Sequence, residues 1–460
     1  MTAKSAPTGG DASPTMRARL LGDVTCPHCW ATFPPENTLW ISSDHPDLQN
    51  DPKIPDEPRR FPAERFHISG DALDARGQRC AAFACPACHL EIPRVAFEFP
   101  PFFISVVGGP ACGKSFLLPA MTWTLRTVMP QVFATQFLEA DPRFNKKLHE
   151  YEQSLFLNPR QDEVVVMEKT QARGTEDLYD QVLQNGKPVF YPRPFIFRMQ
   201  AGDSHPVASA RSPASGRTVC LYDNSGESYV PKSGQYGENF KATDHLGHSQ
   251  ATLFLFDPTQ DIRFRDACAG LSNDPQMRQR DAKLDREAFV LQHTILLNAT
   301  ARMKRLRGLA ESARHTGPLI VVLTKFDAWS CLLPEADELM RLPIAAKVAG
   351  SDGRPVMAFH RPSIDRISNS VRQMLDKYAR EVIDAAEGFS SDVTYLACSA
   401  TGRNVQAAAG GGEASAVFGI RPRDVQPVWC ELPFLVAMER NRLPLLPLTA
   451  DTSRPARDPG

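Results

Sequence analysis

The sequence lacks any long apolar run. No stretch approaches the about eighteen consecutive apolar residues that a membrane-spanning helix requires. The amino-terminal residues also lack the apolar segment of a secretory signal peptide. We therefore expect a soluble, cytoplasmic protein without a membrane partner.

An excess of charge of one sign is missing as well. The 460 residues include 52 lysines and arginines against 53 aspartates and glutamates, a formal net charge of −1, and they contain no basic run. Nucleic acid and other polyanions bind through clustered positive charge. We therefore expect no nucleic-acid partner.

Large apolar residues are scarce at the two ends. The first residues are rich in Ala, Ser, Thr, Pro and Gly, and a second tail of this kind starts near Thr449. Such segments bury too little apolar surface to fold. The remainder suffices for one large domain and one smaller one. We expect disordered tails over 1–20 and 447–460, a small zinc-ribbon-like module with an insertion over 21–98, and a large domain over 99–446.

The cysteines suggest what holds the small module together. There are eleven, an odd number, and four of them form the pairs CPHC (Cys26, Cys29) and CPAC (Cys85, Cys88). Two such pairs supply the four thiolates that a tetrahedral zinc ion prefers. We expect a structural Zn²⁺ site without catalysis, and the alternatives are two disulfides or free thiols. Three competing ligands lie beside the pairs: Cys80, His28 and His89.

The stretch GGPACGKS, from Gly108 to Ser115, has the pattern of a phosphate-binding loop. It follows the apolar run FFISVV and precedes residues able to start a helix. Glycines let backbone amides approach a phosphate, Lys114 would bring a positive charge to the β- and γ-phosphates, and the Ser115 hydroxyl is the expected Mg²⁺ ligand. We expect a nucleoside triphosphate to bind at Gly108, Gly109, Pro110, Ala111, Cys112, Gly113, Lys114, Ser115 and Phe116.

Two later segments add the magnesium and base contacts. In TVCLYDNSGES an apolar strand ends at Asp223, which can hold magnesium through water, and Gly226 can turn its amide toward the γ-phosphate. In PLIVVLTKFDAW a buried strand leads into Thr324, Lys325 and Asp327. The Asp327 carboxylate can accept both N1 and N2 hydrogens of guanine, whereas adenine would leave a buried charge unpaired.

A third segment completes the order. DVTYLACSATG is a further apolar strand that ends near Ser399 and Ala400, and it resembles the SA element whose backbone amide contacts the guanine carbonyl. Alone this pattern is weak. The four elements together follow the order of GTPase motifs, and an ATPase is the alternative.

The periodicity of the chain predicts an α/β fold. Strands are expected at Phe102–Val107, Phe195–Gln200, Thr218–Tyr222, Ala251–Asp257, Leu319–Leu323 and Val393–Ala397. Helices are expected at Asp281–Ala313, Ser363–Ala386 and Pro427–Arg440. Alternating strands and helices form a mostly parallel sheet that helices cover on both faces, with ligands at the carboxyl ends of the strands.

The hydrolytic residues are less well defined. Thr170 is our candidate for the threonine that senses the γ-phosphate, with Thr175 as the alternative, and a further strand region is expected from near Val189. Glu227 stands where many GTPases place the glutamine that orients water. Its negative charge beside the phosphate argues against fast hydrolysis. His245 and His248 could assist, but solvated histidines are the simpler interpretation.

The motif series resembles the TRAFAC class of P-loop GTPases from Phe102 to about Arg442, which implies a Ras-like fold. The zinc-ribbon front and the long inserts also resemble the double-GTPase-type proteins of bacterial conflict systems, which are regarded as nucleotide-dependent switches or effectors in defence. The resemblance implies a slowly hydrolysing regulatory GTPase with GTP, Mg²⁺ and Zn²⁺ as cofactors and a protein partner that reads the nucleotide state. The alternatives are a nucleotide-binding scaffold with negligible hydrolysis and an ATPase.

Overall fold

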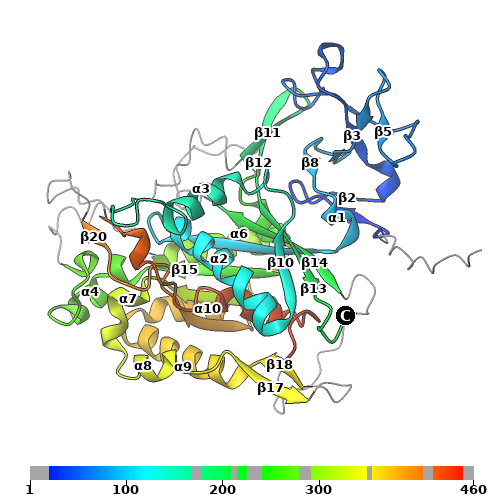
Figure 1. Cartoon of the computed structure of the whole chain (residues 1–460). Coiled ribbons are helices and arrows are strands. Elements are labelled where there is room, and N and C mark those ends of the chain that lie inside the picture. The colour runs from blue at the N-terminus through cyan, green and yellow to red at the C-terminus, as the bar shows by residue number, and fades with distance from the viewer. Residues whose placement is uncertain are drawn as a thin grey trace, which may run out of the picture.

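The computed structural model describes residues 20–166, 179–208, 215–224, 241–278, 292–349, 355–407 and 418–448. Figure 1 shows one large sheet with helices around it and a cluster of short amino-terminal strands beside it. Within the described ranges, no helix is both long and apolar enough to cross a membrane.

The large sheet has seven strands in the order β10-β13-β14-β9-β15-β16-β19. All neighbours pair in parallel except β13, which runs antiparallel to both of its neighbours. The strands are β9 (Pro101–Gly108), β10 (Thr135–Glu139), β13 (Phe195–Ala201), β14 (Gly216–Asp223), β15 (Ala251–Phe256), β16 (Leu319–Leu323) and β19 (Val393–Ala397). The chain leaves β9 toward one side of the sheet and crosses to the other side after β14, so the strand order reverses between β9 and β15.

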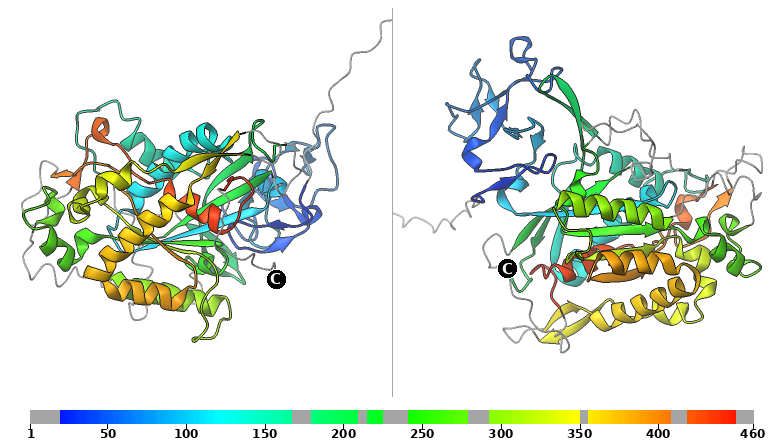
Figure 2. Two further views of the ribbon diagram at one scale, coloured as in Figure 1. Left: turned by 90° about the horizontal axis from the view of Figure 1, so that it is seen from below. Right: turned by 180° about the vertical axis from the view of Figure 1, so that it is seen from behind.

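Helices cover both faces of this sheet. One face carries α2 (Lys114–Phe133), α3 (Lys146–Leu155) and α11 (Leu432–Arg440), and Phe434 of α11 packs against Phe102 and Phe137. The other face carries α6 (Gln292–Leu306), α9 (Arg361–Tyr378) and α10 (Arg380–Phe389), which lie together in the rear view of Figure 2. The expectation of a mostly parallel sheet with helices on both faces is confirmed.

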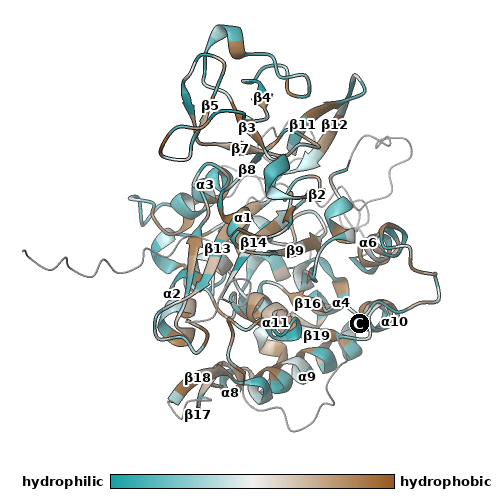
Figure 3. Ribbon diagram, turned by 90° about the vertical axis from the view of Figure 1, so that its right-hand side faces the viewer, coloured by the Kyte–Doolittle hydropathy of each residue, from teal (hydrophilic) through white to brown (hydrophobic). Residues whose placement is uncertain are grey.

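The sheet strands are apolar because both of their faces are covered. All five residues of β16, LIVVL, are buried, and β15 is buried along its whole length. Figure 3 shows the apolar residues gathered on the strands and on the inner sides of the helices. Parallel strands buried on both faces require such continuous apolar sequence.

The amino-terminal module consists of short strands and one short helix: β1 (Val24–Thr25), β2 (Thr32–Phe33), β3 (Leu39–Ile41), β4 (Arg60–Phe61), β5 (Ala72–Leu73), β6 (Arg79–Cys80), β7 (Phe83–Ala84), β8 (Glu91–Ile92) and α1 (Val95–Glu98). A hairpin of β11 (Tyr179–Gln184) and β12 (Lys187–Pro192) projects beside it (Figure 1). Module, hairpin and sheet share one apolar cluster, to which Trp30, Val182 and Tyr222 belong.

Smaller elements fill the periphery. They are α4 (Ile262–Cys268), α7 (Phe326–Trp329), α8 (Ala336–Met340), β17 (Ala345–Ala349), β18 (Pro355–Phe359), β20 (Gln406–Ala407) and β21 (Phe418–Gly419). Single 3-10 turns include η4 (Asp244–Gly247), η5 (Pro258–Gln260), η6 (Pro275–Met277) and η7 (Ser330–Leu332).

The six predicted strands are present, with shifts at some ends. β15 stops at Phe256, because Asp257 leaves the sheet and caps the turn η5 through its side chain. β10 is an edge strand that the sequence analysis missed. The strand region expected near Val189 exists, but it forms the β11–β12 hairpin outside the large sheet.

The predicted helices need larger corrections. Ser363–Ala386 is two helices, because the chain breaks at Ala379 between α9 and α10. Pro427–Arg440 begins only at Leu432. The described part of Asp281–Ala313 is α6, which ends at Leu306, before Gly308 adopts a positive φ of 63°. A backbone in that left-handed conformation ends a helix.

Candidate functional site

The glycine-rich loop joins β9 to α2 at the carboxyl edge of the sheet, where the strand order reverses. Ala111 and Gly113 have positive φ angles of 58° and 97°. A Cβ atom on Gly108 would lie 2.6 Å from the Cys112 Sγ atom and 3.0 Å from the Leu255 Cβ atom, so only glycine fits there. Crevices at this topological position are where open α/β sheets bind ligands.

Lys114, the first residue of α2, turns back over the loop. Its ammonium group donates to the carbonyl oxygens of Gly108 and Gly109, at 2.9 Å each. The side chain is buried within the loop. A cation is thereby held at the centre of the turn, beside the amino end of a helix whose dipole also favours an anion.

Asp223 ends β14, next to the loop strand β9. It is 2% exposed, and neither carboxylate oxygen has a hydrogen-bond partner among the described residues. Burial raises the pKa of Asp223 to about 6, against the opposing charge of Lys114. A buried carboxylate with two unused oxygens is suited to a hard cation such as Mg²⁺, bound directly or through water. The residues present therefore fit the expected magnesium ion.

Thr324 connects the glycine-rich loop to the TKFD segment. Its hydroxyl donates to the carbonyl oxygen of Cys112 at 2.9 Å. The next residue, Lys325, has a positive φ of 56°, and its ammonium group lies 2.6 Å from Asp257 Oδ2 and 2.9 Å from Gln276 Oε1. The two motifs, far apart in sequence, thus lie in direct contact.

The TKFD segment is connected in turn to the SA element. The hydroxyl of Ser399 donates to Asp327 Oδ1 at 2.5 Å and accepts from the backbone amide of Gly402 at 2.7 Å. Burial raises the pKa of Asp327 to about 6, and the hydrogen bond from Ser399 opposes this shift. Ala400 follows Ser399 directly after β19. The Asp327 carboxylate is therefore oriented by a fixed donor and keeps its second oxygen for another partner.

Sequence reasoning missed Asp257, which is fully buried between the glycine-rich loop and Lys325. Its carboxylate accepts from Lys325 and from Gln260, and Gln260 also donates to the carbonyl oxygen of Pro110 at 3.0 Å. A polar residue directly after an apolar strand, like Asp223 and Thr324, was the available indication. The sequence pattern instead predicts Asp257 as the last residue of the strand.

Of the other predicted residues, two are buried or packed against apolar neighbours, and four lie outside the described residues. Phe116 packs beside Tyr151 and Leu155. Cys112 is buried, and burial raises the pKa of its thiol, which makes it unreactive. Thr170, Thr175, Gly226 and Glu227 lie outside the described residues, so their roles stay predictions.

The two histidines that we expected to be solvated differ. His245 is fully buried, stacks on Tyr222 with ring centroids 5.0 Å apart, and contacts Ser105 and Asn224, so the expectation is wrong for this residue. Burial lowers the pKa of His245 to about 3, which leaves the ring neutral. His248 remains exposed, although one face of its ring stacks on Trp30 at 4.8 Å.

The four cysteines of the two CPxC pairs converge in the module. Sγ atoms of Cys26 and Cys88, and of Cys29 and Cys85, lie 3.7 Å apart, and all four atoms lie within 4.8 Å of one another. Four thiolates around zinc at about 2.3 Å would be about 3.8 Å apart. Backbone amides of His28 and Ala87 donate to the sulfurs of Cys26 and Cys85. The cluster could hold zinc.

The competing ligands have other partners. His28 contacts Asp180 and the Glu91 carbonyl, His89 contacts Asp51, and Cys80 lies against Asp74. All four cysteines of the cluster are free thiols in the structure. The alternative of two disulfides is therefore wrong.

A second group of potential ligands is already neutralised. Glu139, His149 and Glu152 lie close enough to share an ion. Arg126, however, donates to Glu152 at 2.8 Å and to Glu139 at 2.7 Å. Because a guanidinium already pairs with both carboxylates of this group, it needs no metal.

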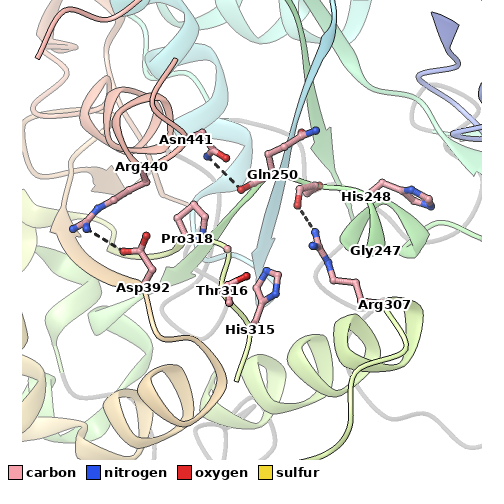
Figure 4. A pocket seen from close by; sticks show the side chains of 12 residues that line it. Gly247, His248, Gln250, Arg307, His315, Thr316, Pro318, Asp392, Arg440 and Asn441 are labelled. Atoms are coloured by element: carbon pink, nitrogen blue, oxygen red, sulfur yellow. Dashed lines mark hydrogen bonds and ion pairs between the residues drawn. The ribbon is translucent and has the colours of Figure 1, made fainter. Parts of the chain in front are cut away.

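A polar cavity of about 510 Å³ lies at the opposite, amino-terminal edge of the sheet (Figure 4). None of the predicted nucleotide-binding residues lines it. Both of its arginines contact acceptors of the chain itself: Arg440 lies 3.1 Å from Asp392, and Arg307 donates to the Ser249 carbonyl. Burial lowers the pKa of His315 to about 4, which leaves this side chain neutral. The cavity therefore has the character of a structural, internally paired region.

No family model matches the chain, and no curated protein matches it. Among solved structures, sup35 complexed with GDP matches with 12% identity and a TM-score of 0.21, over 65% of this chain and 37% of that one. A Thermus thermophilus protein, ttk003000868, matches with 14% identity and a TM-score of 0.22, over 76% of this chain and 40% of that one. The chain spans about two fifths of each, and similarity at this level assigns no activity.

Proposed function

We propose that the protein binds GTP with Mg²⁺ at the carboxyl edge of the sheet and hydrolyses it slowly to GDP and phosphate. The observation that carries this proposal is the pair of hydrogen bonds that join three separate motifs. Thr324 binds the Cys112 carbonyl, and Ser399 binds Asp327. These bonds bring the predicted phosphate-binding and base-binding segments together, which supports recognition of a nucleotide by both.

The phosphate end would be formed by the loop from Gly108 to Phe116. The loop amides and Lys114 would bind the phosphates, and Ser115 and Asp223 would hold the magnesium. Bound Mg²⁺ supplies positive charge to the β- and γ-phosphates. Lys114 already lies at the centre of the loop, so little reorganisation is needed for it to reach a phosphate oxygen.

The base end would be formed by Asp327, Lys325 and the backbone beside Ala400. The oxygen of Asp327 that Ser399 leaves unused, together with the bonded one, can accept two hydrogens from guanine. The stem of Lys325, whose head is fixed on Asp257, would flank the base. An adenine-type edge would offer the Asp327 carboxylate no donor in addition to Ser399.

The proposals of slow hydrolysis and of a regulatory role are supported by the sequence motifs. Thr170 and Glu227 keep their catalytic roles, and Gly226 its role toward the γ-phosphate, as predictions from the sequence. A glutamate at position 227 adds charge beside the γ-phosphate. The role as a switch, with a protein partner and a place in bacterial defence, is supported by the resemblance of the motif order and the zinc-ribbon front to such GTPases. We likewise propose the division into a zinc module over 21–98 and a GTPase domain over 99–446.

Competition among GTP, GDP and ATP for a fluorescent guanine nucleotide tests the proposal. GTP and GDP should bind at least about a hundredfold more tightly than ATP, because a buried carboxylate left unpaired is strongly unfavourable. Asp327→Asn should remove most of that preference. Asp337→Asn, in the exposed part of α8, is the matched control. Equal affinity for ATP would support an ATPase, and binding without phosphate release over many hours would support the scaffold.

A further inference from the structure

The CPHC pair of the cysteine cluster continues directly into a contact with the large sheet. Trp30 follows Cys29, and its indole nitrogen donates to the Tyr222 hydroxyl at 3.0 Å. The Tyr222 hydroxyl donates to the carbonyl oxygen of Pro27, between the two cysteines, at 2.6 Å. Trp30 is 7% exposed and Tyr222 is fully buried. The metal-binding turn is therefore hydrogen-bonded in both directions to the end of β14.

That end of β14 carries Asp223. Successive side chains of a strand point to opposite faces, so Tyr222 and Asn224 share the face toward the module, while Asp223 points to the other face. His245 joins the two residues that flank Asp223, because it stacks on Tyr222 and lies 2.7 Å from Asn224 Nδ2. The residues on both sides of Asp223 are thus fixed: Trp30 contacts Tyr222, and His245 contacts Asn224.

The conformation of Trp30 itself depends on the cysteine cluster. Its φ angle is positive, at 58°, and its amide donates to the Cys26 carbonyl at 3.1 Å. Such a tight turn is strained for a large residue. Metal bonds to Cys26 and Cys29 would hold it closed, and without these bonds the turn would be free to open.

We propose that Trp30 is a positioning residue of the nucleotide site, through which metal bound at the four cysteines sets the position of Asp223. The two sites are then coupled: zinc strengthens binding of the Mg²⁺–nucleotide complex, and that complex strengthens retention of zinc. This inference rests on the proposed function, because it assigns the magnesium site to Asp223.

The first experiment measures guanine-nucleotide affinity with and without Mg²⁺ for Trp30→Phe. The substitution removes the indole donor but keeps an aromatic ring. Because Trp30 acts on Asp223 and not on the glycine-rich loop, Mg²⁺-free affinity should stay unchanged, while the gain from Mg²⁺ should fall about tenfold. Trp40→Phe is the matched control, since Trp40 packs on Phe66 and Phe83 within the same module. An equal loss with and without Mg²⁺ would mean a merely structural role and overturn the proposal.

A double-mutant cycle tests the path. If the effect passes through the Tyr222 hydroxyl, Tyr222→Phe should give the same loss, and the double variant should be no weaker than either single variant. Additive losses would overturn this path.

The second experiment needs no substitution. Zinc loss from the wild-type protein to a colorimetric chelator is followed with and without Mg²⁺ and GTP. Linkage is reciprocal, so the bound nucleotide should raise the apparent zinc affinity about tenfold. GTP that binds without changing zinc affinity would overturn the coupling alone. Absence of GTP binding to the zinc-loaded protein would overturn the proposed function, and the coupling with it.

Discussion

Buried carboxylates at the two edges of the central sheet differ in their partners. At the amino-terminal edge, Asp392 is 5% exposed and lies 3.1 Å from the guanidinium of Arg440. At the carboxyl-terminal edge, Asp223 is 2% exposed, and no described residue forms a hydrogen bond with its carboxylate oxygens. A buried carboxylate is strongly unfavourable unless it is paired. Asp392 at the first edge has a cation of the chain beside it, whereas Asp223 at the second edge has no such partner among the described residues, which favours the cation that we propose there.

The pairing of buried charge also distinguishes the cavity from the candidate site. The cavity in Figure 4 is a hollow whose arginines bind a carboxylate or a carbonyl oxygen of the chain itself. The candidate site is marked instead by two carboxylates with raised pKa values, Asp223 and Asp327. Perturbed, unsatisfied groups indicate function better than empty volume does.

Breaking the pair at the amino-terminal edge should have the largest effect on stability. Arg440→Ala leaves Asp392 buried without its cation, which should lower the free energy of unfolding by about 3 to 5 kcal/mol. Chemical denaturation measures the change. Asp392→Asn in the same background should restore part of the loss, and nucleotide affinity should stay at the wild-type value. A stable Arg440→Ala protein would contradict the contrast between the edges.

Removing the ammonium group of Lys114 at the carboxyl-terminal edge should instead impair nucleotide binding or turnover and leave the fold intact. Lys114→Ala should reduce nucleotide affinity or turnover about 10²- to 10³-fold, because the ammonium group would neutralise charge on the phosphates. Lys146→Ala, at an exposed position that starts α3, is the control. Titration with labelled GTP and phosphate release give the readout. Unchanged binding would remove the loop from the proposed site.

The unpaired carboxylate should also make stability depend on pH. Burial raises the pKa of Asp223 from 3.8 to about 6, so the folded state holds this proton more tightly than the unfolded state. The free energy of unfolding should therefore fall as pH rises from about 4 to about 6, by up to about 3 kcal/mol, and stay lowered above that range. Asp223→Asn should remove this contribution, while the similar contribution of Asp327, whose pKa burial also raises to about 6, should remain. Denaturation without nucleotide from about pH 4 to about pH 8, repeated with Mg²⁺, compares the two proteins.

The smallest expected effect concerns the link between phosphate and base ends. Thr324→Val keeps the shape of the side chain but removes the hydroxyl that donates to the Cys112 carbonyl. Loss of one such hydrogen bond should lower stability by about 1 kcal/mol and guanine-nucleotide affinity severalfold. Thr324→Ser, which keeps the donor, should retain affinity. A loss in Thr324→Ser with none in Thr324→Val would show that the methyl group, not the hydroxyl, matters.

Predictability from sequence varied along the chain for physical reasons. The strands β9, β14, β16 and β19 were located closely, because continuous apolar runs bounded by polar residues have few alternatives. The break at Ala379 was missed, because α9 and α10 both continue the same amphipathic pattern and only tertiary packing separates them. Asp257 was missed because a polar residue at the end of an apolar run can be the last residue of the strand, as Asp223 is, or the first residue after it, as Thr324 is.

The sequence by itself determined the α/β class, the positions of the glycine-rich loop and of the TKFD segment, and the four cysteines that meet in the module. These follow from local patterns, since strands, tight turns and metal knuckles are each specified over a few residues. Only the tertiary structure decided that, among the described residues, Asp392 has a partner and Asp223 has none, and that Trp30 rests on Tyr222. Burial and pairing depend on residues distant in the chain, which a local pattern cannot specify.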